Sequence, residues 1–318
     1  MRRWLQATLA AEHGVAANLE FLTPGEFVGR ALAANLPPGE HAARDELDAT
    51  TLHWHLYAAL TDATLLAQPA LRAIAAHVAG GDPLRAWSLA GELAGVFEKY
   101  QAWRRDWLLR WEAGADPDDP QAELWRAVAA GRTHRARRIQ DYLARYAEGD
   151  ALPAGLPPRL FAFATLNVSP DVLRVMATQA RVGTLHFYMP TPTRSYWGDL
   201  QALSTRLRAG EPEPFGAPGG ENPLLQAWGA AGRDFVALLG SYEVVHPSGE
   251  IPAHVDPEAD PSPSLDAGGL RGGLLHRLQG DLFHRRPAPS GPRLPAPRRD
   301  DPSLQVHACH TRLRELQV

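Results

Sequence analysis

The basic residues carry the clearest chemical information. Lysine and arginine together number 32 in the 318 residues, and Lys99 is the single lysine. A phosphate-binding P-loop needs glycine N–H groups, a lysine for the outer phosphates and a Ser or Thr hydroxyl for magnesium. Lys99 lies in Phe97-Glu98-Lys99-Tyr100 with no glycine run before it. The sequence therefore predicts no ATP-hydrolysing site in this chain.

Other catalytic patterns are also incomplete. Asp116-Pro117-Asp118-Asp119 supplies the acidic half of a metal-dependent nuclease motif, but the lysine that completes that motif is missing. A Ser-His-Asp hydrolase places its serine in a G-x-S-x-G turn, and no such string occurs. Ser169 precedes Pro170 and is expected to cap a helix, the alternative being a loop that serves nucleotide or DNA. We expect no catalytic residue in this chain.

Histidine and cysteine give no convincing metal site. His307 and Cys309 alternate onto one face of a predicted strand, which is two ligands where zinc needs three or four. His53 and His55 flank Trp54 on a predicted helix and cannot converge on one ion, so a packing or surface role is expected. We expect neither a metal nor another cofactor in this chain, so any Mg²⁺ and ATP would be used by partner subunits.

One predicted helix, residues 133–146, suits nucleic-acid binding. Its two faces carry different chemistry: Arg135, Arg138, Tyr142 and Arg145 on one, and Ala136, Ile139, Leu143 and Tyr146 on the other. Guanidinium groups one turn apart can hold successive phosphates, and the Tyr142 ring can stack on a base. The alternative is an ordinary solvated charged face.

A second candidate is Trp103-Arg104-Arg105-Asp106-Trp107, which combines rings for base stacking with cations for phosphate. Trp107 and Trp111 lie one helical turn apart and are expected in the core. Trp103 and Arg104 are therefore the pair predicted to contact nucleic acid.

Composition sets the context for these candidates. An apolar content of 45% in 318 residues allows a large core, as two domains or as one domain with an insertion. The formal charge of −4 means that DNA binding would require a local basic patch. The single cysteine excludes an intrachain disulfide. We find neither a membrane-spanning apolar run nor a signal-peptide core, and expect a cytoplasmic protein.

The apolar spacing predicts helices over residues 1–150, including 48–66 and a long one over 83–111 that begins after Asp82. A change follows residue 153. Short apolar runs at 159–164 and 183–189 flank a helical stripe at 170–180, which predicts a βαβ unit and hence a parallel sheet. Further helices are expected at 224–239 and 265–283, exposed connectors at 248–263 and 286–302, and a strand at 303–309.

Several short strings, in order, resemble the gamma-subunit (RecC) family of exodeoxyribonuclease V, the RecBCD helicase–nuclease. They span nearly the whole chain: Trp4-Leu5-Gln6, Gly14-Val15-Ala16-Ala17-Asn18, Pro24 with Phe27, Asp106-Trp107-Leu108, Trp111-Glu112, Pro153-Ala154-Gly155-Leu156-Pro157, Ser195-Tyr196-Trp197-Gly198-Asp199, Asn222-Pro223-Leu224-Leu225, Gly229, Gly232-Arg233-Asp234-Phe235, His307-Ala308-Cys309-His310 and Arg314-Glu315-Leu316. Each string is weak alone, and the specificity comes from their colinear order.

This resemblance implies an α/β fold, an inactivated superfamily 1 helicase-like (P-loop-like) parallel sheet domain with a large all-helical insertion. It places a remnant of the first helicase-like domain at 1–22, the insertion at 23–150, the α/β part at 151–247, linkers with one helix at 248–302 and the start of a second helicase-like domain at 303–318. Family members extend beyond both ends, so we expect an N-terminal fragment.

The family's subunit splits duplex ends, channels single strands and scans for the Chi sequence, while RecB-like and RecD-like subunits hydrolyse ATP and cut DNA. The resemblance therefore implies a non-catalytic, DNA-binding subunit acting in double-strand-break repair by homologous recombination. The alternative is a purely structural module that docks the helicase/nuclease subunit without touching DNA.

Positions lining the family's Chi-scanning tunnel correspond to Arg3, Thr23, Gly29, Gly95, Val96, Glu98, Arg104 and Arg135. Arg104 and Arg135 keep the family's arginine, and Glu98 keeps an acidic group. Four positions depart from the family's best-known pattern: Arg3 replaces an amide, Thr23 an apolar residue, Gly29 a tryptophan and Gly95 an aspartate. These departures argue against recognition of the same Chi octamer.

Overall fold

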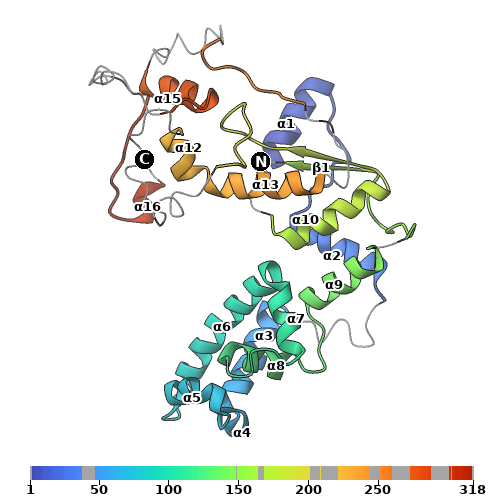
Figure 1. Cartoon of the computed structure of the whole chain (residues 1–318), viewed down its shortest axis with the longest axis vertical. Helices are drawn as coiled ribbons and strands as arrows, with labels where there is room; N and C mark the ends of the chain where they lie inside the picture. The colour runs from blue at the N-terminus through green and yellow to red at the C-terminus, as the bar shows by residue number, and fades with distance from the viewer. Residues whose placement is uncertain are drawn as a thin grey trace. The chain divides into compact units, whose positions relative to one another are not determined.

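The computed structural model describes residues 2–37, 47–147, 149–163, 168–200, 208, 221–243, 249, 251–259, 273–287, 301 and 303–316. The chain divides into two compact units. The first comprises Met1–Ala162 with Val168–Phe187, and the second comprises Phe163–Asn167 with Tyr188–Val318. The structure is mixed α/β, mostly helical, with a small two-stranded parallel sheet (Figure 1). None of the helices among these residues is long and apolar enough to cross a membrane.

Helices dominate the first unit. They are α1 (Arg2–His13), α2 (Pro24–Asn35), α3 (Ala49–Thr61), α4 (Ala63–Leu66), α5 (Arg72–Val78), α6 (Pro83–Trp103), α7 (Arg105–Glu112), α8 (Pro120–Ala129) and α9 (Arg135–Arg145), with a 3₁₀ turn at Pro69–Leu71. Short polar residues fix several starts, as predicted. The Asp82 carboxylate accepts the Leu84 N–H at 3.0 Å, and Pro83 occupies the first helical position.

The predicted helix over 83–111 is divided at Arg104, where the backbone adopts φ −136° and ψ 40°. Both helices are hydrogen-bonded up to this residue. The Arg104 N–H donates to Tyr100 O at 2.8 Å, and the Trp107 N–H donates to Arg104 O at 3.0 Å. The Tyr100 ring of α6 contacts the Trp107 and Trp111 rings of α7, with centroids 5.7 and 5.9 Å apart, so side-chain packing joins the two helices across the bend.

The helical core of the first unit lies between α3, α6, α7 and α8 (Figure 1). Ala86, Ala90 and Ala94 form the small-residue face of α6 that allows close approach to α3. Phe97 and Trp125 are fully buried, with ring centroids 5.3 Å apart. Leu52, Leu56, Ala59 and Leu60 of α3 are buried in this core. The helix predicted over 48–66 is divided at Asp62, because α3 ends at Thr61 and the Asp62 side chain accepts the Thr64 N–H at 2.8 Å to start α4.

Helix α9 lies between two sets of helices, since it contacts α6 and α7 as well as α2 and α10 (Pro170–Ala177). The buried Asn35 side chain joins the end of α2 to this region. Its Nδ2 donates to Ala31 O at 2.7 Å and Ala154 O at 2.9 Å, while its Oδ1 accepts from the Tyr146 hydroxyl and the Ala154 N–H, both at 2.7 Å. Every polar valence of this amide is satisfied within the first unit.

Replacing Asn35 by leucine is expected to lower the free energy of unfolding by about 2–4 kcal/mol, because it leaves buried groups on Tyr146 and Ala154 without partners. Tyr146→Phe, which removes one of the four hydrogen bonds, should cost about 1 kcal/mol. Urea denaturation followed by circular dichroism measures both. Equal losses for the two variants would contradict the bridging role of Asn35.

The predicted βαβ unit is confirmed as β1 (Arg159–Phe163), α10 and β2 (Thr184–Tyr188), with a 3₁₀ turn at Thr178–Arg181 before the second strand. Ser169 caps α10 as predicted, since its hydroxyl accepts the Val172 N–H at 3.4 Å. Residue 164 of the first predicted strand lies outside the described residues.

The second unit contains α12 (Pro223–Trp228), α13 (Ala230–Glu243), α15 (Leu274–Phe283) and α16 (Arg312–Glu315). The helix predicted over 224–239 is divided at Gly229, where an added Cβ would overlap the Leu225 carbonyl oxygen. Of the helix predicted over 265–283, residues 265–272 lie outside the described part of the chain.

The strand predicted over 303–309 is wrong, since these residues adopt turn and irregular structure. Apolar alternation identifies a sequence that fits a sheet, but a strand also needs a neighbour whose backbone groups it can pair with. His307 Nε2 instead lies 3.2 Å from the side-chain oxygen of Gln305, two residues away.

Candidate nucleic-acid interface

The corner between α6 and α7 displays two indole rings and a guanidinium group together. Trp103 is 41% exposed and Trp107 is 38% exposed. Between them in sequence, Arg104 is exposed, and its guanidinium carbon lies 5.3 Å from the centroid of the Trp107 ring. Its Nη1 also donates to Trp103 O at 3.1 Å. These contacts hold the guanidinium over the Trp107 ring and against the Trp103 carbonyl group.

Buried aromatic residues support this corner from behind. The Trp107 ring lies 5.7 Å from Tyr100 and 6.3 Å from Trp111. Trp111 is 4% exposed, and its indole N–H donates to Asp116 Oδ2 at 2.9 Å. The core prediction is therefore confirmed for Trp111 but wrong for Trp107, because the chain turns at Arg104 and brings the outer face of Trp107 to the surface.

The chemistry available at this corner is that of a single-strand binding surface. An exposed indole offers a π-face on which any base can stack, and a neighbouring guanidinium offers donors to phosphate oxygens. The Trp107 ring is held by Tyr100, Trp111 and Arg104 before any ligand arrives, so ordering it would cost little of the binding energy. The corner therefore has the residue types and the rigidity that base stacking requires.

The predicted cationic face of α9 is arranged differently from the expectation. Tyr142 is fully buried, its hydroxyl lies 2.8 Å from Thr178 Oγ1 and its ring lies 4.9 Å from the Tyr146 ring. The prediction that Tyr142 offers a ring to a base is therefore wrong. The physical reason is that α10 covers this side of α9, so burial raises the pKa of the phenol.

The arginines of α9 are largely used within the chain. At the C-terminal end of α9, the Arg145 Nη1 group donates to Asn35 O at 2.6 Å, and Asn35 is the last residue of α2. At the N-terminal end of α9, the Arg135 guanidinium lies beside the first turn of α2, because a Cβ added to Gly25 would be 3.7 Å from Arg135 Nη1. Helices α2 and α9 therefore run side by side in the same direction. Arg138 is half-buried.

Gln101 fixes where Arg135 begins α9. The buried Gln101 amide accepts the Arg135 N–H at 2.9 Å through Oε1 and donates to Leu47 O at 2.9 Å through Nε2. Sequence reasoning missed this residue, although an amide one turn after Phe97 on the buried face of α6 was a usable signal.

The remaining tunnel-related positions are distributed over α1, α2 and α6. Arg3, Gly29 and Glu98 are exposed, whereas Gly95 and Val96 are half-buried. Thr23 caps α2: its hydroxyl accepts the Glu26 N–H at 3.2 Å, and its own N–H donates to Glu26 Oε2 at 2.6 Å. Hydrogen bonds from Thr23 and the charge of Arg2 hold the pKa of Glu26 below its usual value.

The structure brings some of these positions together but not others. Thr23 and Arg135 lie close to the same residue, Gly25. A Cβ added to Gly25 would lie 3.9 Å from Thr23 Oγ1 and 3.7 Å from Arg135 Nη1. At Gly29 and Gly95 an added Cβ would meet nothing within 4 Å, so both leave open space on their helices.

Glu112 is the second positioning group that sequence reasoning missed. Its carboxylate accepts from Trp125 Nε1 at 3.0 Å, His134 Nε2 at 2.7 Å and Arg137 Nη2 at 2.5 Å, joining α7, α8 and α9. His134 Nδ1 accepts the Arg137 N–H at 3.3 Å, so a neutral imidazole protonated on Nε2 satisfies both contacts. Burial opposes ionisation of Glu112, but hydrogen bonds from His134, Arg137 and Trp125 lower its pKa to about 2.

Comparison with known proteins identifies the family. The family model described as "RecC, N-terminal domain" matches residues 1–285. The chain therefore belongs to the RecC family. The membership confirms the resemblance of the short strings.

The chain is similar to three RecBCD enzyme subunit RecC proteins. It is 27% identical to that of Escherichia coli K12, 25% to that of Haemophilus influenzae and 27% to that of Mycolicibacterium smegmatis, in each case over the whole chain. The alignments cover 31%, 32% and 27% of these relatives. The chain thus spans about a third of the length of the relatives that it matches.

Proposed function

We propose that this chain is part of a non-catalytic, DNA-binding subunit of an ATP-dependent exodeoxyribonuclease V complex in the cytoplasm, with RecB-like and RecD-like partner subunits. In this complex it helps to split duplex ends, to channel single strands and to scan for a Chi-like sequence during double-strand-break repair. Nuclease, helicase and ATP-hydrolysing activity, with their Mg²⁺ and ATP, belong to the partners.

The observation that supports this proposal most directly is the corner at Trp103, Arg104 and Trp107. Two exposed rings and one guanidinium lie together there, and aromatic neighbours support the Trp107 ring, which suits a strand that must slide without sequence-specific hydrogen bonds. Glu98 is exposed on α6, the helix that also carries Trp103. An acidic group at this position repels phosphate and would favour contact with base edges.

The proposal extends to the fold. The βαβ unit fits the edge of an inactivated superfamily 1 helicase-like domain, with α2–α9 as its helical insertion, and the domain limits expected from the sequence remain part of this proposal. The single lysine at Lys99, outside any glycine-rich loop, agrees with a domain that no longer hydrolyses nucleotide.

A purely structural docking module is the second candidate, and one observation favours it. Arg145, which was predicted on the cationic face of α9, contacts Asn35 O within the chain, and Arg137 of the same helix contacts Glu112. If DNA runs elsewhere, such arginines hold helices together and the exposed indoles would meet a partner subunit instead.

Crosslinking separates the two functions. A photoreactive 3′-ended single strand is bound to the assembled complex with ATP withheld, irradiated, and the adducts are mapped by mass spectrometry. We expect adducts at Trp103, Arg104 or the first turn of α9. Adducts confined to the partner subunits would support docking and reject direct DNA contact by this chain, with an unrelated surface such as Trp54 as the internal background.

A further inference from the structure

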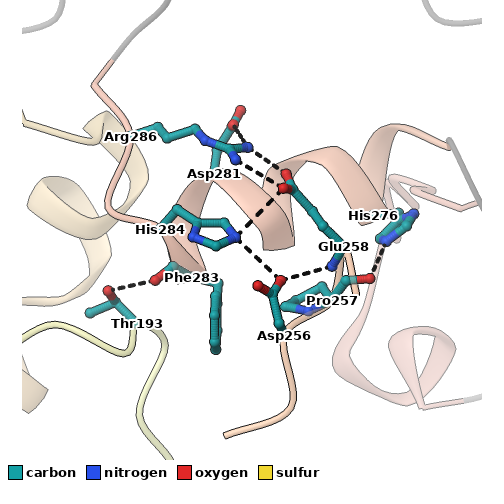
Figure 2. Close-up of polar contacts among 9 residues, drawn as sticks. All are labelled: Thr193, Asp256, Pro257, Glu258, His276, Asp281, Phe283, His284 and Arg286. Carbon is teal, nitrogen blue, oxygen red and sulfur yellow. Dashed lines mark hydrogen bonds and ion pairs between the residues drawn. The ribbon is translucent and has the colours of Figure 1, made fainter. Parts of the chain in front are cut away.

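A cluster of charged side chains in the second unit lies outside the candidate nucleic-acid interface. Within the part of the chain that the structure describes, Asp256, Glu258 and His284 bring their ligand atoms within 4.8 Å of one another. His284 Nε2 lies 3.2 Å from Asp256 Oδ1 and 3.5 Å from Glu258 Oε2. Figure 2 shows the imidazole edge directed between the two carboxylates. We propose that these three side chains bind one divalent transition-metal ion, with Zn²⁺ the best fit.

Two separate segments position the three ligands. Asp256 and Glu258 occupy a tight turn, in which the Ala259 N–H donates to Asp256 O at 3.1 Å and the Glu258 N–H donates to Asp256 Oδ1 at 2.9 Å. His284 follows the last residue of α15, and its N–H donates to Gly280 O at 3.0 Å. The histidine and the two carboxylates come from different segments, so it is the fold that brings them together.

The spacing agrees with tetrahedral coordination. Zn–N and Zn–O bonds of about 2.0–2.2 Å place neighbouring ligand atoms of a tetrahedron about 3.3–3.6 Å apart. The two distances from His284 Nε2 to the carboxylates, 3.2 and 3.5 Å, lie at or close to this range. Three protein ligands leave a fourth position, which water or another ligand can take.

The local charge also suits a divalent cation. Asp256, Glu258 and Asp281 carry three negative charges, and Arg286 carries one positive charge within the same network. With a neutral imidazole the network has a charge of about −2, the complement of one divalent ion. Because an imidazole joins the carboxylates, zinc and similar borderline metals are favoured over Mg²⁺ and Ca²⁺.

Arg286 orients one ligand without displacing the ion. Its Nη1 contacts Glu258 Oε1, its Nη2 donates to Glu258 Oε2 at 2.9 Å, and Nη1 also lies 3.4 Å from Asp281 Oδ1 (Figure 2). The guanidinium thus holds both oxygens of Glu258, and Oε2, which lies 3.5 Å from His284 Nε2, would coordinate the ion through its second lone pair, as metal ligands held by an orienting group commonly do. The ion would clamp residues 251–259 onto the C-terminal end of α15.

The test uses the 318-residue chain after dialysis against a chelator. Zn²⁺ is titrated in competition with a fluorescent chelator, and Co²⁺ is added separately because its visible absorption reports the coordination geometry. We expect one equivalent bound, with a tetrahedral Co²⁺ spectrum. Asp256→Asn, which keeps the oxygen that accepts the Glu258 N–H, and His284→Ala should each weaken binding by at least about 10–100-fold.

His276→Ala is the matched control, because His276 lies on the same helix and contacts Pro257 O at 2.7 Å but is not among the three ligands. It should bind metal like the parent chain. Circular dichroism without metal checks that each variant is folded. Absence of stoichiometric binding, or equal binding by Asp256→Asn and the parent, would overturn the proposal and leave only an imidazole placed between two carboxylates.

Discussion

Replacing Glu112 by alanine is expected to lower the free energy of unfolding of the first unit by about 2–4 kcal/mol. The substitution leaves the indole N–H of fully buried Trp125 and the imidazole of His134 without their acceptor, and it releases Arg137. These three side chains belong to α8, to the start of α9 and to α9 itself, so one substitution loosens three contacts. Urea denaturation monitored by tryptophan fluorescence measures the change.

Two further variants isolate the network. Glu92→Ala removes an exposed carboxylate from α6 and should change the free energy of unfolding by less than about 0.5 kcal/mol. Glu112→Gln keeps an oxygen that can accept from Trp125 or His134 but presents an amide to Arg137, so an intermediate loss is expected. If Glu112→Ala matched Glu92→Ala, the carboxylate would not organise these helices.

The same network predicts a pH dependence. The pKa of Glu112 in the folded chain is about 2, below its ordinary value of 4.5. A lowered pKa stabilises the fold fully above the ordinary value, and the contribution is lost as the pH falls through the folded value. The difference in free energy of unfolding between the parent and Glu112→Gln should therefore be constant near neutral pH and shrink between about pH 4.5 and 2. A difference that grew on acidification would contradict this account.

Trp103→Ala is expected to weaken binding of a single strand by the assembled complex by about 5- to 150-fold, since stacking of one base on an aromatic ring is worth about 1–3 kcal/mol. Trp103 is exposed beside Arg104, so its loss removes the stacking surface without opening a core cavity. Trp103→Phe should recover most of the affinity. Fluorescence anisotropy with a labelled oligonucleotide measures each constant.

A second tryptophan provides the control. Trp54 is 59% exposed on α3, where it packs against Trp87 at a centroid distance of 4.8 Å, and Trp54→Ala should leave the affinity unchanged. Arg104→Ala should reduce the dependence of the binding constant on salt by about one released counterion. Loss of affinity only in Trp54→Ala would place the strand on another surface of this chain.

Local signals in the sequence predicted elements well where a short-range cause was sufficient. Asp82 and Ser169 cap helices where expected because an N-cap needs only a side-chain oxygen next to free N–H groups. The βαβ unit followed from two short apolar runs around one helical stripe. Each of these predictions depends on residues close together in the chain.

Predictions failed where a distant segment decides the outcome. Tyr142 lies on the polar side of its helix, and it is buried because α10 packs against this side. The apolar periodicity predicted a single helix over 83–111, because such a pattern carries no information about the bend at Arg104. That bend exposes Trp107. The predicted strand at 303–309 had the right alternation, but among the described residues only β1 and β2 pair into a sheet.

The site residues divide in the same way. Trp103 and Arg104 were predicted and are exposed together, because two adjacent residues in the sequence need little tertiary information to meet. Gln101 and Glu112 were missed because their partners are distant in the sequence. Gln101 contacts Arg135, 34 residues away, and Glu112 contacts Arg137, 25 residues away.

The ring contacts across Arg104 have a mechanical consequence. A hinge absorbs a pulling force by changing its angle, whereas this bend would have to separate the Tyr100 ring of α6 from the Trp107 and Trp111 rings of α7 before it could open. Tension on a strand stacked at Trp103 would therefore move α6 and α7 as a single lever. Its inner end rests on α9, which contacts both helices, so load at the indoles would be transmitted to the start of α9 beside Gly25.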